Sequence, residues 1–181
     1  MFVIDEWGGD GAGLDMLAEV LRATVLGGGS VSFVLPFELD DARRFFVDKV
    51  APGVRARTRR VLVARMDGRI VGTVQLDIAT PPNQPHRAEV MKLLVHPDAR
   101  RHGIARALMV AVEDVARECG RSLLTLDTVT GGAAEKLYAS LGYVTSGVIP
   151  GYALDSSGTT VEPTTIMYKV LSPNRDASGR D

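Results

Sequence analysis

The sequence contains only one cysteine, Cys119, among its 181 residues. A single cysteine excludes an internal disulfide framework and a zinc site built from several cysteines. No run of about 18 apolar residues occurs, so no transmembrane helix is expected. The first residues, MFVIDEWGGDG, lack a basic region followed by an apolar stretch, so no secretory signal is expected either. Together these absences predict a cytoplasmic protein without membrane contact.

The sequence also lacks an excess of positive charge. Lys and Arg number 21 against 22 Asp and Glu, which gives a formal net charge of −1. General nucleic-acid binders are usually more basic, so no nucleic-acid partner is expected. Apolar residues make up 45% and charged residues 24%, as in an ordinary globular protein. We expect a single domain over residues 1–171 and a polar, disordered tail over 172–181.

Apolar periodicity divides the chain into strands and helices. Residues 88–95 and 122–128 have the pattern of strands, and residues 103–119 between them have that of a helix with Glu113 on its wet face. This order predicts a parallel unit with a right-handed crossover. The other expected elements are helices at 14–25, 40–50 (ended by APG at 51–53) and 133–141, a hairpin at 60–65 and 70–76, and strands at 143–149 and 164–171, with PGY at 150–152 in a loop. The fold class is therefore α/β or α+β, with a mixed twisted sheet of about six to seven strands flanked by about four helices.

Cations and small residues are concentrated where the central helix is expected to start. In PDARRHGIARALM, residues 97–109, Arg100, Arg101 and Arg106 surround Gly103. A helix start exposes unpaired N–H groups and a partial positive charge, and glycine lets a ligand approach the backbone. The stretch therefore predicts an anion site. It contains neither G-x-x-x-x-G-K-[ST] nor G-x-G-x-x-G, so a phosphate ligand of another kind is indicated.

The same stretch resembles the cofactor motif of the GCN5-related N-acetyltransferase (GNAT) superfamily. That motif, (Q/R)-x-x-G-x-(G/A), is matched by Arg100-x-x-Gly103-x-Ala105, which follows a strand and Pro97 and precedes KLYASLGY. The resemblance implies the acyl-CoA N-acyltransferase fold and acetyl-CoA as cosubstrate, with no metal. Its pyrophosphate would lie at the helix start and its pantetheine arm along the preceding strand. The cofactor-binding residues implied in this way are Leu93, Leu94, Val95, Arg100, Arg101, His102, Gly103, Ile104, Ala105 and Arg106.

Further segments between residues 14 and 171 resemble the tabtoxin-resistance type of these acetyltransferases. They are GGGSVSF, HRAEVMKLLVHP, LLTLDT, LYASLGY, PGYALDSSG and TTIMYKVL. This resemblance implies acetylation of a small amino-acid-like amine, such as a toxin. Many superfamily members have an asparagine that contacts the cofactor before the last helix, whereas this sequence has Gly131 and Gly132 there. A backbone amide could take over that contact.

Acetyl transfer to an amine requires a base, because the amine is mostly protonated at neutral pH. Glu89 and Asp127 are the candidates, since each is a carboxylate in an otherwise apolar strand and burial would raise its pKa. The alternative is structural: Glu89 pairs with Arg87 or Lys92, and Asp127 caps the following loop. In regular alternation, Glu89 would share a face with Met91, Leu93 and Val95.

Tyr138 is the candidate acid. The superfamily resemblance places a tyrosine here that protonates the departing thiolate, and the alternative is a core tyrosine with its hydroxyl at the rim. His86, His96 and His102 lack the spacing of metal ligands. The sequence thus predicts direct acetyl transfer to a small-molecule amine in a ternary complex. Acetylation of a peptide N-terminus or lysine, a non-catalytic acyl-CoA sensor, and a homodimer all remain open.

Overall fold

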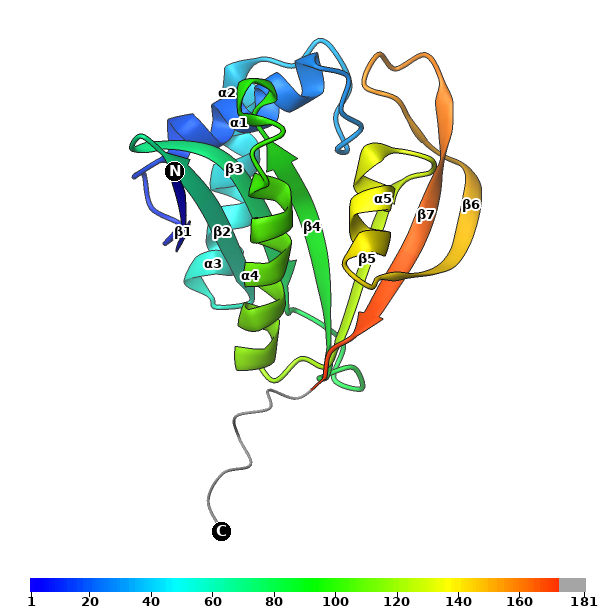
Figure 1. The fold of residues 1–181 in the computed structure, drawn as a ribbon. Helices are drawn as coiled ribbons and strands as arrows, with labels where there is room; N and C mark the ends of the chain where they lie inside the picture. The colour runs from blue at the N-terminus through cyan, green and yellow to red at the C-terminus, as the bar shows by residue number, and fades with distance from the viewer. Residues whose placement is uncertain (173–181) are drawn as a thin grey trace.

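Seven strands form one sheet in the computed structural model, which describes residues 1–172 (Figure 1). Their order is β1-β2-β3-β4-β5-β7-β6, and the pair β4–β5 is parallel while its neighbours are antiparallel. This mixed sheet, flanked by helices, confirms the predicted fold class. The predicted tail lies outside the described residues except for Ser172. The strands are β1 (Phe2–Glu6), β2 (Arg59–Met66), β3 (Arg69–Asp77), β4 (Arg87–Val95), β5 (Leu123–Val129), β6 (Val144–Leu154) and β7 (Val161–Val170).

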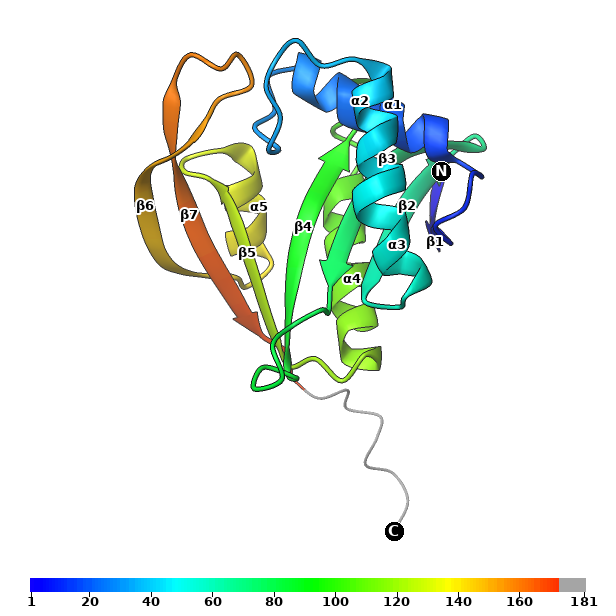
Figure 2. The ribbon, with the colours of Figure 1, turned by 180° about the vertical axis from the view of Figure 1, so that it is seen from behind.

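Helices cover both faces of the sheet. On one face lie α1 (Leu14–Leu26), α2 (Leu39–Phe45) and α3 (Ala51–Arg55), and on the other lie α4 (Ile104–Glu118) and α5 (Ala133–Ser140), as Figures 1 and 2 show. Strand β2 serves both layers, because Val61 and Val63 pack with α1 whereas Leu62 and Ala64 pack with α4. This alternation is the period of two that a strand buried on both faces requires. No helix within residues 1–172 is long and apolar enough to cross a bilayer.

Three local predictions were wrong. The APG stretch does not end the second helix, because Pro52 occupies the first turn of α3, where a missing N–H costs nothing. The short strand β1 was missed, since its five residues include Asp5 and Glu6 and it is defined by its pairing with β2. The PGY stretch lies within β6, where the register with β7 shifts between Ile149 and Ala153.

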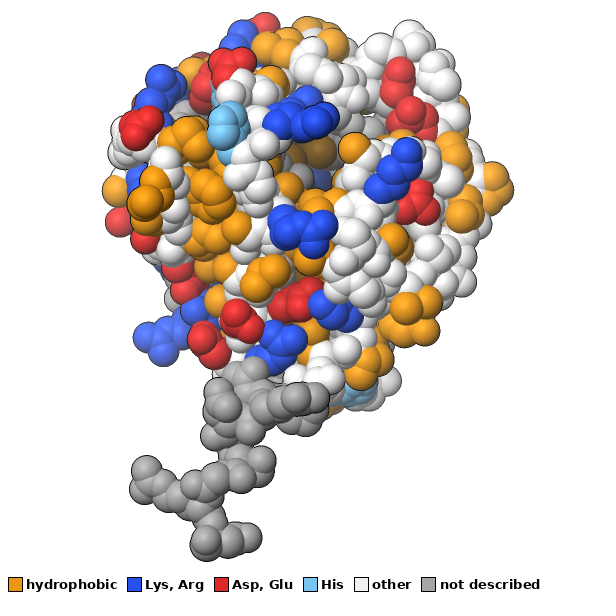
Figure 3. Space-filling view, viewed as in Figure 1, with side chains coloured by type: hydrophobic (Ala, Val, Ile, Leu, Met, Phe, Trp, Pro, Cys, Tyr) orange, Lys and Arg blue, Asp and Glu red, His pale blue; other side chains and the backbone are white. Residues whose placement is uncertain are grey.

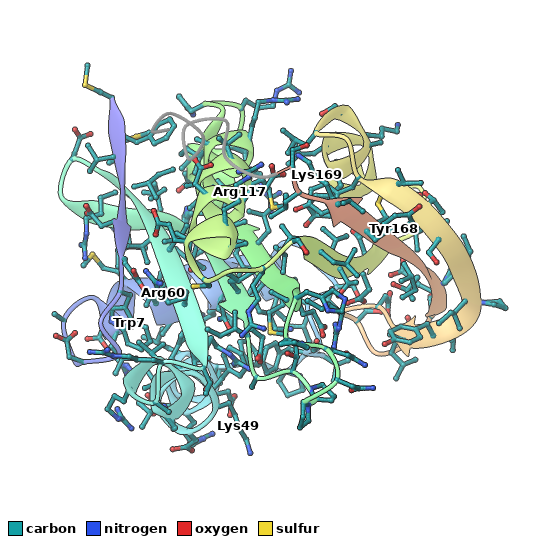
Figure 4. All side chains as sticks on the ribbon, turned by 90° about the horizontal axis from the view of Figure 1, so that it is seen from below. Trp7, Lys49, Arg60, Arg117, Tyr168 and Lys169 are labelled. Carbon is teal, nitrogen blue, oxygen red and sulfur yellow. The ribbon has the colours of Figure 1, made fainter. Side chains whose placement is uncertain are left out.

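Glu113 is buried, so the prediction that it lies on the solvent-exposed face of α4 was wrong. Only 6% of the residue is exposed, and both carboxylate oxygens accept hydrogen bonds from Lys169 Nζ at 2.7 Å. Arg117, one helical turn further on, approaches the same carboxylate at 3.7 Å. Figure 4 shows Arg117 on α4 and Lys169 on β7 beside each other. This pairing links α4 to β7. The two cations compensate the cost of burying the negative charge of Glu113.

Candidate active site

The central parallel strands separate along their length. Pairing between β4 and β5 is confined to three residue pairs, from Arg87 with Leu123 to Glu89 with Thr125. Beyond Glu89, β4 continues to Val95 with β3 on one side and no described strand on the other. Its N–H and C=O groups on that side have no ladder to join, as at the edge of a sheet. An extended ligand with amide groups could pair with this free edge.

A β-bulge interrupts β4 at Lys92. Thr73 pairs with Leu94 and Gln75 pairs with Met91, so two β4 residues lie opposite Val74, and Lys92 has a φ of +52°. A bulge adds one residue and reverses the alternation that follows it. Leu94 consequently packs into the α1 layer, whereas Leu93 and Val95 contact the α4 layer.

The prediction that Glu89 shares a face of the sheet with Met91, Leu93 and Val95 was therefore wrong in part. Glu89 and Met91 precede the bulge, and they lie on the opposite face of the sheet from Leu93 and Val95. Leu94 is 1% exposed, so its side chain cannot contact a ligand. The bulge thus separates two parts of β4. Before it, Glu89 faces away from α4, and after it, Leu93 and Val95 face the α4 layer.

A cavity of about 260 Å³ lies at the start of α4. Gly103 caps the helix with a φ of +78° and no side-chain cap, and the amides of residues 104–106 donate to no described group. Arg101 is also left-handed, with a φ of +69°, so successive backbone amides curve around the cavity as in an anion-binding nest. Figure 3 shows this side of the molecule hollowed, with Lys and Arg side chains beside the hollow. The cavity is lined by Val95, Ala99, Arg100, Arg101, Gly103, Ile104, Ala105, Arg106 and Leu137.

Seven of the ten residues expected to bind the cofactor line this cavity, and three do not. His102 turns away and donates from Nδ1 to the Arg100 carbonyl at 2.9 Å. Leu93 and Leu94 precede Val95 on β4 and do not line the cavity. Among the three arginines, Arg106 donates to Ser140 on α5 at 2.7 Å, which joins α4 and α5 across the rim. Arg101 makes no hydrogen bond or ion pair with a described residue, so its charge is available to an anion.

The carboxylate of Glu89 belongs to a polar row that crosses four strands. Arg59 pairs with Asp77, Asp77 with Glu89 and Glu89 with Thr125 in the strand registers. Arg59 Nη2 donates to Asp77 Oδ2 at 2.5 Å, and Arg87 Nη1 lies 3.8 Å from Glu89 Oε2. Burial raises the pKa of Glu89, Arg87 opposes the rise, and Asp127 and Asp77 add to it. The structural alternative for Glu89 is thus partly present, because it does pair with Arg87.

Asp127 and Tyr138 lie on the other side of the gap between β4 and β5. Asp127 follows Thr125 by two residues on the same face of β5, its side chain is exposed, and it accepts a hydrogen bond from Thr164 Oγ1 at 3.3 Å. Tyr138 on α5 is 7% exposed, and the described residues offer its hydroxyl no hydrogen bond. Burial and then Asp127 raise the pKa of Tyr138. Asp127 therefore raises the pKa of both Glu89 and Tyr138, although Tyr138 packs in the α4 layer and Glu89 lies on the opposite face of the sheet.

The two glycines before α5 use their amides within the protein. Gly131 has a φ of +77° and donates to the Glu135 carboxylate, and Gly132 donates to the Val129 carbonyl at 3.3 Å. A cofactor contact at this position would compete with Glu135. These residues therefore do not offer a free substitute for the asparagine found in many superfamily members.

On the acceptor side, the gap is bordered by two loops, one between α1 and α2 and the other between β6 and β7. The Leu35 amide, between α1 and α2, donates to the Ser156 carbonyl in the β6–β7 turn at 2.8 Å. These two loops approach each other at the end of the sheet where β4 and β5 terminate (Figures 1 and 2). Lys92 also reaches the first loop, and its Nζ donates to Val31 O and Ser32 Oγ at 2.7 Å each. A charged residue in an apolar strand was the available signal for Lys92.

Within residues 1–172, no group of three or more His, Cys, Asp or Glu side chains has the geometry of a metal site. The chemistry that this part of the chain offers is acid–base chemistry beside an anion-binding helix start. A cavity at α4, a free strand edge and paired carboxylates suit a long anionic thioester on one side and an amine on the other.

Comparison with known proteins agrees with this geometry. Residues 31–143 match the sequence model described as the Acetyltransferase (GNAT) family. The chain is 37% identical over 114 residues to an uncharacterized N-acetyltransferase from the hisH-hisA intergenic region of Azospirillum brasilense, covering 61% of this chain and 65% of that protein. It is 36% identical over 97 residues to the IAA acetyltransferase of Azospirillum brasilense, covering 53% and 61%. The chain thus spans slightly less than two thirds of each of these relatives.

The fold is shared with solved structures. The yncA protein of Salmonella typhimurium, solved with its cofactor acetyl-CoA, superposes with a TM-score of 0.77 at 19% sequence identity. The alignment covers 100% of this chain and 98% of that one. At this identity the likeness establishes the fold.

Proposed function

Since this chain belongs to the acetyltransferase (GNAT) family, we propose that it transfers the acetyl group of acetyl-CoA to the amine of a small amino-acid-like compound. One observation carries the proposal, namely the divergence of β4 and β5 beyond Glu89. It leaves a free strand edge between the α4 cavity and the side chains of Glu89, Asp127 and Tyr138. Acetyl-CoA supplies an activated acetyl thioester when it is bound.

The start of α4 fits the diphosphate of a coenzyme. Free amides at residues 104–106 and the charge of Arg101 would hold its oxygens. A Cβ added at Gly103 would point into open space, with no atom within 4 Å, so a side chain there would occupy the room needed by a ligand. The free edge of β4 near Leu94 would pair with the pantetheine amides, and one of its N–H groups would stabilise the developing oxyanion.

We assign acid–base catalysis to the side chains of Glu89, Asp127 and Tyr138. Glu89 or Asp127 removes a proton from the acceptor ammonium, so that its nitrogen can form the C–N bond as the C–S bond breaks. The raised pKa of Glu89 makes it a better proton acceptor than an ordinary carboxylate. Tyr138 is protonated at neutral pH, as an ordinary tyrosine is and as its raised pKa reinforces, and it gives that proton to the departing thiolate.

A small acceptor is supported by two features. The sequence resembles the tabtoxin-resistance type of acetyltransferase, which implies an amino-acid-like amine. The hydrogen bond between Leu35 and Ser156 joins the two loops that border the acceptor mouth. A polypeptide would have to pass these joined loops, whereas a metabolite need only enter beside them.

Release of free thiol from acetyl-CoA, measured against a panel of free amino acids, amines and peptides, tests the proposal. Mass spectrometry of a metabolite extract incubated with the enzyme then identifies the acetylated product. We expect turnover with free amino-acid-like amines and little with peptide N-termini or lysine side chains. Binding of acetyl-CoA without turnover on any amine would favour a sensor, and preferential acetylation of peptides would overturn the small-acceptor assignment.

A further inference from the structure

We propose that Lys92 binds the carboxylate of the acceptor, so that the preferred substrates are amino acids with a free carboxylate beside the reacting amine. This inference rests on the proposed acetyl transfer and specifies its substrate class. It is carried by a charged side chain at the acceptor mouth that forms no ion pair within residues 1–172.

Lys92 is a half-buried lysine, and the described groups that its ammonium contacts directly are all neutral. Its ammonium donates to Val31 O and Ser32 Oγ and lies over the rings of Phe33 and Phe45, at 5.6 and 6.0 Å from their centroids. No carboxylate of residues 1–172 lies within ion-pair distance of it. A charge in such surroundings is costly unless it is paired. Burial lowers the pKa of Lys92, Asp127 opposes this change and Arg59 adds to it.

The β4 bulge fixes where this charge points. The left-handed conformation at Lys92, with a φ of +52°, turns the side chain toward the loop between α1 and α2. Such a conformation is strained for a residue with a side chain, so the surrounding structure must stabilise it. An ammonium has three N–H donors, and the two hydrogen bonds to the loop leave one for a ligand.

The position of Lys92 suits a substrate with both charges. Lys92 lies three residues after Glu89 on the same strand, and Asp127 is close enough to affect its pKa. A bound amino acid would direct its carboxylate to Lys92 and its ammonium to Glu89 and Asp127. Opposite charges at the two ends would fix the orientation of the amine before proton removal. A neutral or purely cationic amine would meet only the carboxylates.

Matched pairs of acceptors test the inference. Each L-amino acid in the panel is compared with the primary amine that it gives on loss of its carboxylate, using thiol release to obtain kcat/KM for both. We expect the wild-type enzyme to favour the amino acid by about tenfold or more, the range of one charge-assisted hydrogen bond. In Lys92→Met, which keeps the apolar stem, this ratio should fall toward one. Lys92→Arg, which keeps the charge, should retain much of the preference.

A second measurement does not depend on turnover. In protein labelled with ¹⁵N-lysine, the Lys92 Nζ signal is assigned by its loss in Lys92→Met, and N-acetyl-L-amino acids are titrated as product-like probes. A saturable shift of that signal is expected, and no shift would overturn the inference.

The outcomes separate this inference from the proposed function. Equal kcat/KM for amino acids and their decarboxylated amines, or a preference that survives in Lys92→Met, would overturn the role of Lys92 while acetyl transfer stands. Absence of transfer to every acceptor would count against the proposed function, and the ¹⁵N titration would still decide whether Lys92 binds carboxylates. A Lys92→Met variant that also loses affinity for acetyl-CoA would show a structural role for Lys92 and overturn the inference.

Discussion

Glu89 lies directly opposite Asp77 in the pairing of β3 and β4, and Arg59 donates to Asp77 from the far side. Burial raises the pKa of Glu89, and Asp77 adds to this rise. If Glu89 is the base, activity must fall as the pH drops through this raised pKa, because the protonated form cannot accept a proton. Asp77→Asn removes a negative neighbour and frees Arg59, so the acid limb of a kcat/KM profile should move to lower pH. A limb that stays in place would show that Glu89 does not set it.

The two carboxylates are expected to carry the proton transfer together. Glu89→Gln combined with Asp127→Asn should lower kcat by about 10² to 10⁴, the range of general base catalysis, while acetyl-CoA affinity changes little. The measurements are thiol release and calorimetric titration with acetyl-CoA. Asp114→Asn, which changes an exposed carboxylate on α4, is the matched control. Parental turnover in the double variant would mean that neither carboxylate is the base.

Two neighbouring tyrosines provide a matched test of the acid. Tyr138 and Tyr143 are both buried, with ring centroids 5.8 Å apart, and the hydroxyl of Tyr143 is buried without a partner among the described residues. Tyr138→Phe should lower kcat by about tenfold or more, because the thiolate then leaves unprotonated. Tyr143→Phe should keep its activity and gain up to about 1 kcal/mol in the free energy of unfolding, because it removes an unsatisfied polar group. Equal kcat in the two variants would exclude Tyr138 as the acid.

The start of α4 can be compared with its end. Gly103 and Gly120 have φ values of +78° and +69°, and an added Cβ meets no atom within 4 Å at either position. Gly103→Glu should raise the dissociation constant of acetyl-CoA by about tenfold or more, since it fills the cavity and repels the diphosphate. Gly120→Glu imposes similar backbone strain at the far end of the helix and should leave that constant near the parental value. Similar affinities in both variants would argue against the cavity as the diphosphate site.

The pair formed by Glu113 and Lys169 predicts a stability effect without a catalytic one. Lys169→Met leaves a buried carboxylate with only Arg117 at 3.7 Å and should lower the free energy of unfolding by about 3 kcal/mol. The double variant Glu113→Leu with Lys169→Met should recover most of that loss, because no unpaired charge stays buried. Urea denaturation of the three proteins measures both effects. A single variant as stable as the parent would show that Arg117 alone compensates Glu113.

Much of the fold could be predicted because its determinants are local. Asp67-Gly68 specifies a tight turn, and the structure has a hairpin there. The helical period after Gly103 predicted α4, and the glycine does adopt the left-handed conformation that a side chain disfavours. The arginines around it line one cavity for the same reason, since they are neighbours in sequence at a helix start.

The parts that escaped prediction depend on distant partners. No local signal marks the bulge at Lys92, which exists because β3 pairs with β4 in two registers on either side of Val74. Glu113 lies between the buried residues Met109 and Ala116 at helical spacing, but its charge favoured exposure, and only Lys169, 56 residues away, explains its burial. Strand β1 has only five residues, two of them acidic, and it is defined by its pairing with β2. Each case requires knowledge of which segments meet in space.

The hydrogen bond from the Leu35 amide to the Ser156 carbonyl joins the loop between α1 and α2 to the β6–β7 turn at the acceptor mouth. The three residue pairs shared by β4 and β5 join the two halves of the sheet at one end of the gap, and this hydrogen bond joins the two loops at the other end. An acceptor too large to pass beside these loops would have to break this hydrogen bond to enter. If the loops must separate for such an acceptor, its entry depends on the rate of loop opening, and the enzyme selects by size before the amine meets Glu89 or Asp127.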